Sequence, residues 1–457
     1  MPQEQTSQRS SRNIPFQAFE HYMLADDRPS HSMTCHIRFW FDGIFERAAF
    51  ESAVDEALKR HPVFQMTVVG SALLPTGKIH WHHPGGPTKP FINWASESTP
   101  LQEPPGGFAQ DIRSEIGLRF WLRESIETTH AKTTIIVQFH HSVCDGIGLF
   151  QFMEDVFIYY GRAAGIATPE PRVIDPDQFY ERGEFSLTPE DWKHRRPVDI
   201  ARALRFFKSI ARPLAPSPRS EIKNPHTADL LAVERVIVSE FILTALRQRS
   251  KQVLASVNDL MIHALFLTVA AWNRERGDTR QDIRVAIATS LRGARDAVLS
   301  AANVVSMVFL NRSHKAITAT GLLEGIVKET SEIKANRLGV TLPRVMRRLG
   351  RYPFLTWAFL RLPICSATVV LTNLGRPFAD SPLTGPDGLL RIGSLTLTSL
   401  DTMPPVRPKT RASISINYYG GSLSMTLRYD STTITRADAA SFLARFRDQV
   451  TLGAEPL

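Results

Sequence analysis

The sequence predicts an α/β protein of two lobes. Segments rich in β-branched and aromatic residues, which favour strands, recur between segments whose apolar residues follow helical spacing. At 457 residues the chain is long for one hydrophobic core, and two domains are the usual solution at this length. The periodic pattern weakens between residues 164 and 230, where prolines recur, so this stretch is the expected linker.

Four regions of the chain follow from this pattern. We expect a disordered N-terminus at 1–13, a first lobe at 14–175, a linker at 176–230 and a second lobe at 231–457. The first residues are polar and lack an apolar segment of signal-peptide length. No run of about 18 uncharged apolar residues occurs, so no membrane-spanning helix is expected. The sequence therefore predicts a cytoplasmic protein.

The overall composition is that of an ordinary globular protein, with 43% apolar and 22% charged residues. The three cysteines (Cys35, Cys144 and Cys365) lie far apart and form no CxxC pair, so neither a disulfide framework nor a zinc site is indicated. The formal net charge of +9 suits anionic partners. Nucleic acid, a phosphate-bearing thioester carrier and an anionic membrane surface are the classes to consider.

The first lobe is expected to open with a short helix at 14–24 and a strand at 34–41. An amphipathic helix at 45–60 follows, and His61-Pro62 stops it because the residue before a proline resists the helical conformation.

Residues 80–83, His-Trp-His-His, invite a metal-site interpretation because His80 and His82 would share one strand face. No carboxylate or cysteine lies close by, so a half-exposed strand is favoured and no metal site is expected. A loop at 84–108 and a strand at 118–122 complete the approach to the central stretch.

The chain is organised around residues 133–161. The β-branched run at 133–139 predicts a strand that ends in His140 and His141. Asp145-Gly146 signals a turn, with Gly146 allowing the backbone to turn tightly, and apolar residues at helical spacing follow from Leu149 to Tyr160.

Side chains alternate along a strand, so the two histidines cannot share one role if the strand persists through both. A histidine titrates near neutral pH and can act as a general base, and Asp145 could pair with a buried arginine. A structural histidine beside a plain turn is the alternative interpretation.

Two basic amphipathic zones occur, one inside the linker and one after it. One helix is expected at 198–214, with an apolar stripe beside four cations, and a second basic-apolar helical zone at 336–363. Either zone could lie on a membrane, and the second could border an acyl-binding channel. Packing against the protein's own core is the favoured interpretation of both.

The second lobe is expected to resume with a strand at 231–238 and a buried helix at 255–273. A strand at 283–290 ends in Leu291-Arg292-Gly293, and a strand at 367–371 leads into the turn at 372–377. A strand hairpin turning at Gly420-Gly421 and a helix from near Thr435 close the chain.

The segment His140-His141-Ser142-Val143-Cys144-Asp145-Gly146 resembles the HHxxxDG motif of the chloramphenicol-acetyltransferase-like acyltransferases. This superfamily includes peptide-synthetase condensation domains, plant BAHD acyltransferases, polyketide-associated acyltransferases and wax ester synthases. Other stretches are also similar to this superfamily. They are the order of elements at the start of the chain, the segment VNDLMIHAL, Leu291-Arg292-Gly293 followed by NVVS, and the TNLG turn. The DFGWG signature of the plant branch is missing. The resemblance implies two chloramphenicol-acetyltransferase-like lobes, each a mixed sheet flanked by helices, with an active-site channel between them.

The resemblance also implies roles for particular residues. His141 would be the general base beside His140 and Gly146, and Asp145 would be structural, paired with Arg292. Arg295 is close enough in sequence to compete for that pair. In the TNLG turn, the candidate oxyanion or substrate-channel groups are Thr372 and Asn373. The alternative is a plain turn with no role in the site.

The implied activity is acyl transfer from a thioester donor, either acyl-CoA or an acyl carrier protein, to a hydroxyl or amine of a small molecule, lipid or peptide. No metal or nucleotide cofactor is expected, because the thioester is a co-substrate. We expect a stand-alone monomer, with peripheral membrane contact as an open alternative. A catalytically silent relative that binds acyl ligands or a carrier protein is the competing interpretation. Nucleic-acid binding is disfavoured because no such module is recognisable and prolines interrupt the basic segments.

Overall fold

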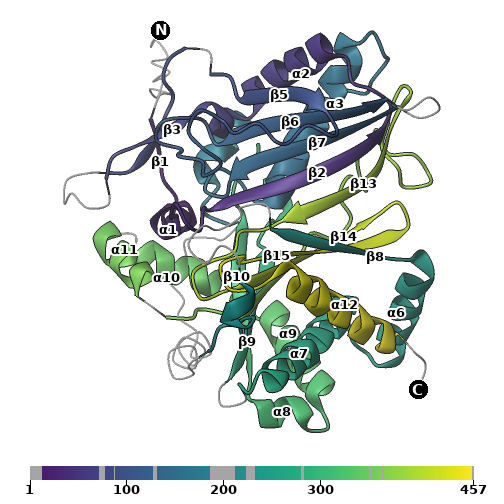
Figure 1. The fold of residues 1–457 in the computed structure, drawn as a ribbon. Helices are drawn as coiled ribbons and strands as arrows, with labels where there is room; N and C mark the ends of the chain where they lie inside the picture. The colour runs from purple at the N-terminus through teal and green to yellow at the C-terminus, as the bar shows by residue number, and fades with distance from the viewer. Residues whose placement is uncertain are drawn as a thin grey trace.

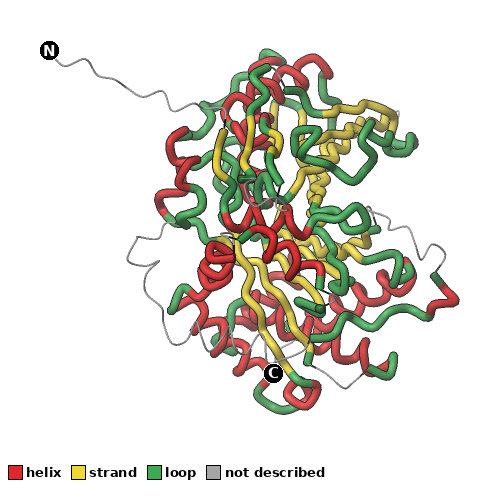
Figure 2. The backbone as a smooth tube through the Cα atoms, turned by 90° about the vertical axis from the view of Figure 1, so that its left-hand side faces the viewer, coloured by secondary structure: helices red, strands yellow, loops and turns green. Residues whose placement is uncertain are grey.

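The computed structural model describes residues 13–71, 78–86, 88–126, 131–185, 211–222, 232–278, 282–349, 352–362 and 364–454. Two six-stranded mixed sheets lie in two lobes with helices at their flanks, which confirms the predicted α/β class (Figures 1 and 2). The expected disorder at 1–13 falls almost wholly outside the described residues, and so does most of the basic helix expected at 198–214.

The first sheet has the strand order β12-β13-β2-β7-β6-β5. Its strands are β2 (Thr34–Asp42), β5 (Phe91–Ser96), β6 (Leu118–Ile126), β7 (Ala131–His140), β12 (Arg391–Ile392) and β13 (Leu395–Met403). Helices α2 (Arg47–Arg60) and α3 (Gly146–Ala163) pack against one face. Alternate strand side chains such as Phe39 point to this face, where Phe39 meets Phe157 of α3 edge-on at 5.9 Å.

A small sheet consists of β1 (Asn13–Pro15), β4 (His80–His82) and β3 (Thr67–Val69), and helix α1 (Ala18–Asp26) follows β1 in the chain. The helix expected from residue 14 therefore begins later, because Pro15 keeps its neighbour extended. His80 and His82 lie in β4 as the strand interpretation expected, and His82 Nδ1 is 2.8 Å from Asn13 Oδ1.

The second sheet has the order β10-β9-β11-β14-β15-β8. Its strands are β8 (Val233–Val238), β9 (Ile283–Ser290), β10 (Val305–Arg312), β11 (Val369–Asn373), β14 (Ala412–Tyr419) and β15 (Ser422–Tyr429). The helices of this lobe are α6 (Glu240–Gln252), α7 (Val257–Glu275), α8 (His314–Thr318), α9 (Leu322–Ala335) and α12 (Arg436–Leu452). Helix α7 is buried as its all-round apolar sequence predicted, and its Trp272 meets Phe442 of α12 edge-on at 5.3 Å.

Helices α10 (Thr341–Leu349) and α11 (Pro353–Arg361) occupy the basic-apolar zone and contact α1 of the first lobe (Figure 1). Short 3₁₀ helices lie at Pro62–Gln65, Pro176–Glu181, Arg219–Glu221, Ala294–Val298 and Leu338–Val340. Among the described helices, no single one has the length and apolarity of a membrane span; α6 and α7 meet both criteria only when taken together, and they are bent by 100°.

Strands β12 and β13 belong to the first sheet although they lie within the 231–457 range assigned to the second lobe. Strand β13 pairs antiparallel with β2 and so covers an apolar strand that would otherwise form the sheet edge. The buried carboxylate of Asp401 in β13 is 2.8 Å from Arg38 of β2 and 3.6 Å from Arg235 of β8. A single residue therefore contacts cations from both lobes.

Candidate active site

The strand, turn and helix around the HHxxxDG segment hold it rigidly between the lobes. Strand β7 ends at His140, and the backbone N–H of His141 donates to the carbonyl of Met33 at 2.8 Å. Asp145 is the N-cap of α3, where its Oδ1 accepts from the N–H of Gly148 at 2.9 Å. The motif is therefore fixed at both its strand end and its helix end.

The two histidines have different surroundings. His140 is fully buried, its Nδ1 accepts from the N–H of Ser142 at 3.2 Å, and its Nε2 lies 3.6 Å from Asp27 Oδ2. His141 instead lines a cavity between the lobes. This separation follows from the alternation of side chains at a strand end.

His141 is held in one tautomer. Its Nδ1 is 3.2 Å from the carbonyl oxygen of Cys144, and because that oxygen only accepts, Nδ1 must carry the proton. Nε2 is then unprotonated, and no residue in the described part of the chain hydrogen-bonds to it. Burial lowers the pKa of His141 below its ordinary value, against the opposing charge of Asp145. The ring is therefore neutral at pH 7, with a lone pair available.

Asp145 links the motif to the second lobe. Its Oδ2 is 2.7 Å from Arg292 Nη1 and accepts from the N–H of Val304 at 2.8 Å. Arg292 Nη2 also donates to the carbonyl of Ala302 at 3.1 Å. Arg295, which the sequence could not separate from Arg292, is exposed in a 3₁₀ helix. The carboxylate thus accepts three hydrogen bonds that fix the motif relative to the second lobe.

Asn303 is a further positioning residue whose role sequence reasoning missed. Its Nδ2 donates to the carbonyls of His141 at 2.7 Å and Ser142 at 2.9 Å. In the sequence, the segment NVVS carries a resemblance and no indication of this role. An amide reaching backbone carbonyls leaves no pattern in sequence, so only the fold reveals this contact.

Gly146 serves a different purpose from the one that the sequence suggested. Its backbone is not in the left-handed region. A Cβ at this position would lie 3.1 Å from both terminal methyl groups of Leu374. Gly146 therefore permits a close approach between the start of α3 and the turn that follows β11.

The cavity beside His141 is lined from both lobes and has a volume of about 90 Å³. Thr372 and Asn373 line it, together with Ser290 and His36. Among the described residues the Thr372 hydroxyl has no hydrogen-bond partner, whereas Asn373 Oδ1 accepts from Gly375 N–H at 2.9 Å and its Nδ2 donates to Asn258 at 3.3 Å. Asn373 therefore fits the interpretation of a plain turn residue, whereas the hydroxyl of Thr372 is free to donate a hydrogen bond.

The comparisons with known proteins bear on this geometry. The first condensation domain of the CDA synthetase superposes with a TM-score of 0.67 and 15% identity, over 98% of this chain and 97% of that chain. Trichothecene 15-O-acetyltransferase from Fusarium sporotrichioides gives a TM-score of 0.67 and 13% identity, over 97% and 96% of the two chains. A mutant starter condensation domain of rhizomide synthetase RzmA in complex with C8-CoA gives 0.64 and 13%, over 97% and 95%.

No protein-family model and no curated protein matches the sequence. The likeness to these structures is therefore one of fold, and at that level it confirms the two-lobed architecture that the motif implied.

Proposed function

We propose that this chain transfers an acyl group from a thioester donor to a hydroxyl or amine acceptor, with His141 as the general base. The observation that carries the proposal is the state of the His141 ring, which is neutral, fixed in one tautomer and open at Nε2 toward a cavity between the lobes. A general base needs this combination of geometry and protonation state.

The reaction balances without a redox step or a metal. Nε2 of His141 takes the proton of the acceptor as its oxygen or nitrogen attacks the thioester carbonyl carbon. The carbon–sulfur bond then breaks, the acyl group stays on the acceptor, and the protonated His141 returns the proton to the departing thiolate. The free hydroxyl of Thr372 is the candidate donor to the developing oxyanion.

The solved structures with this fold support the proposal by what they contain. One is an O-acetyltransferase and another is bound to C8-CoA. Asp145 and Arg292 would serve by holding the motif rather than by touching the substrate, because the carboxylate is already engaged by Arg292 and two backbone N–H groups.

One observation favours the catalytically silent alternative. The cavity beside His141 has a volume of about 90 Å³, which is well below the roughly 300–1,000 Å³ typical of small-molecule sites. A protein that bound acyl ligands elsewhere would not need a larger space at His141.

Thiol release distinguishes the two functions. The enzyme would be supplied with acyl-CoAs of increasing chain length and with acylated carrier protein, each with and without a mixture of alcohols and amines. His141→Ala and His140→Ala would be measured in parallel, with circular dichroism to establish folding. We expect acceptor-dependent release by the wild type and a loss of about 10²–10⁴-fold in folded His141→Ala. Tight donor binding without release by the wild type would establish the silent alternative.

A further inference from the structure

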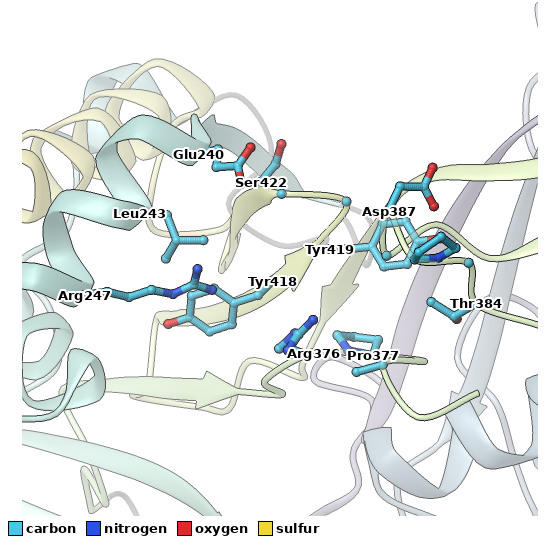
Figure 3. A pocket seen from close by; sticks show the side chains of 16 residues that line it. Glu240, Leu243, Arg247, Arg376, Pro377, Thr384, Asp387, Tyr418, Tyr419 and Ser422 are labelled. Atoms are coloured by element: carbon cyan, nitrogen blue, oxygen red, sulfur yellow. The ribbon is translucent and has the colours of Figure 1, made fainter. Parts of the chain in front are cut away.

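A cavity with a volume of about 670 Å³ opens beside the β14–β15 hairpin. Four segments line it, as Figure 3 shows: the start of α6, the hairpin, the turn after β11 and the loop at 384–388. Gly420 and Gly421 form the two-residue hairpin turn with φ of 53° and 76°, as their sequence predicted. The hairpin therefore presents a rigid wall to this space, which we call the hairpin cavity.

Two arginines reach into the hairpin cavity without an anionic partner. Arg247 comes from α6 and Arg376 from the turn after β11, and Figure 3 shows both side chains directed into the space beside Tyr418. Both residues are exposed, and within the described ranges neither makes an ion pair or a side-chain hydrogen bond. Two unpaired guanidinium groups on one cavity are a binding arrangement for a phosphate, which accepts paired N–H bonds from each.

The acidic residues of the cavity do not cancel these cations. Asp387 is engaged by Arg391, at 2.8 Å through one carboxylate oxygen and 2.5 Å through the other. Glu240 lies against the hairpin turn, within 3.1 Å of the position that a Cβ on Gly421 would take. Glu240 is in the first turn of α6, where the helix dipole stabilises a carboxylate. With Asp387 paired to Arg391, Arg247 and Arg376 face one remaining lining carboxylate, Glu240, and leave a net positive charge.

The hairpin cavity lies next to the active-site cavity along the chain. Thr372, Asn373 and Leu374 line the active-site cavity, and Arg376 lines the hairpin cavity two residues later. Two residues span at most about 7 Å. The N–H of Tyr418, which also lines the hairpin cavity, donates to the carbonyl of Gly375 at 2.8 Å and holds this turn in place. A molecule with a phosphate at one end and a reactive group at the other could occupy both cavities.

We propose that the hairpin cavity binds the phosphate of the donor's phosphopantetheine arm, with Arg247 and Arg376 as its ligands. The inference rests on the proposed function, because it identifies which end of a thioester donor this surface holds. The same phosphate occurs in acyl-CoA and on an acyl carrier protein, so the two arginines recognise what those donors share. They determine donor affinity and take no part in proton transfer.

The test compares donors with and without the phosphate on the same thioester arm. Acyl-4′-phosphopantetheine, acyl-CoA and acylated carrier protein carry the phosphate, and acyl-pantetheine, which differs from the first of these in the phosphate alone, lacks it. For the double variant Arg247→Ala/Arg376→Ala, we expect KM to rise at least about tenfold for the phosphate-bearing donors, with kcat retained. KM for acyl-pantetheine should stay that of the wild type. Arg219→Ala, an exposed arginine outside the cavity, is the matched control and should change neither value.

The outcomes show separately whether the two arginines bind a phosphate and which donor carries it. A rise in KM with acyl-CoA alone or with carrier protein alone supports the site and names the donor. Unchanged KM values for all donors in the double variant overturn it. If the wild type turns over no donor, the proposed function fails, and calorimetric titration with CoA decides this inference separately. Binding weakened at least about tenfold in the double variant supports the site, and equal or absent binding overturns it.

Discussion

Replacing Asp145 by alanine removes the acceptor of three hydrogen bonds at the junction of the lobes. Arg292 loses its carboxylate partner at 2.7 Å, and the N–H groups of Gly148 and Val304 lose acceptors at 2.9 and 2.8 Å. Asp145 is 4% exposed, so water does not readily replace it. Arg292 is left as a largely buried cation without a counter-charge.

The expected loss of stability is large. Breaking a buried ion pair from one side typically costs about 3–5 kcal/mol, mostly because the remaining charge is unpaired. Each backbone N–H left without an acceptor typically costs about 1–3 kcal/mol more, although the cavity allows partial hydration. We therefore expect Asp145→Ala to lower the free energy of unfolding by at least about 3 kcal/mol.

A double-mutant cycle with Arg292→Ala measures the pair directly. Urea unfolding would be followed by circular dichroism for the wild type, both single variants and the double variant. We expect the double variant to be clearly more stable than the sum of the single losses predicts, because it holds no unpaired charge. Exposed Asp387→Ala, which breaks a surface pair with Arg391, is the control and should unfold nearly as the wild type does.

Two results would refute this reasoning. Strict additivity of the two losses would show that the ion pair does not couple the lobes. Full stability of Asp145→Ala with activity abolished would show that the carboxylate acts in the chemistry instead of in the structure.

Three further predictions concern the same region. Asn303→Ala should lower kcat more than it raises KM, because it frees the backbone carbonyl of His141 that Asn303 holds. A rise in KM with kcat unchanged would contradict a positioning role. Gly148→Ala should destabilise the fold in a thermal melt, because its Cβ would lie 2.9 Å from the backbone carbonyl of Ala302; an unchanged melting temperature would show that the helix start can shift. Stability should fall as pH drops from 6.5 to 5.5, since burial holds the pKa of His36 well below its ordinary value and only the unfolded chain takes up the proton. The slope is up to about 1.4 kcal/mol per pH unit for each such histidine, and a flat urea midpoint across this interval would refute it.

The sequence was sufficient for the local geometry of the motif. A β-branched strand, two histidines and an Asp-Gly pair before an apolar-periodic helix are short-range signals, and the structure has this strand, turn and helix. The contact between Asp145 and Arg292 lies beyond any local pattern, and it was expected from the resemblance alone.

Long-range features could not be read in the same way. Strand β13 alternates apolar and polar residues, a pattern typical of a strand, yet alternation never says which sheet a strand joins. The clamp made by Asn303 and the close approach of Leu374 to Gly146 depend on how the lobes dock. The hairpin cavity is lined by segments that are adjacent only after folding.

The placement of β13 has a consequence for biosynthesis. Arg38 and Asp401, which pair across β2 and β13, are 363 residues apart in the chain. The first sheet therefore keeps an open, apolar edge at β2 until most of the second lobe has left the ribosome. Closing so long a loop makes folding slow, and the nascent first lobe is exposed to edge-to-edge aggregation meanwhile. Truncation anywhere before residue 395 should thus yield an aggregating fragment and no isolated first lobe, although the HHxxxDG motif lies wholly within residues 140–146.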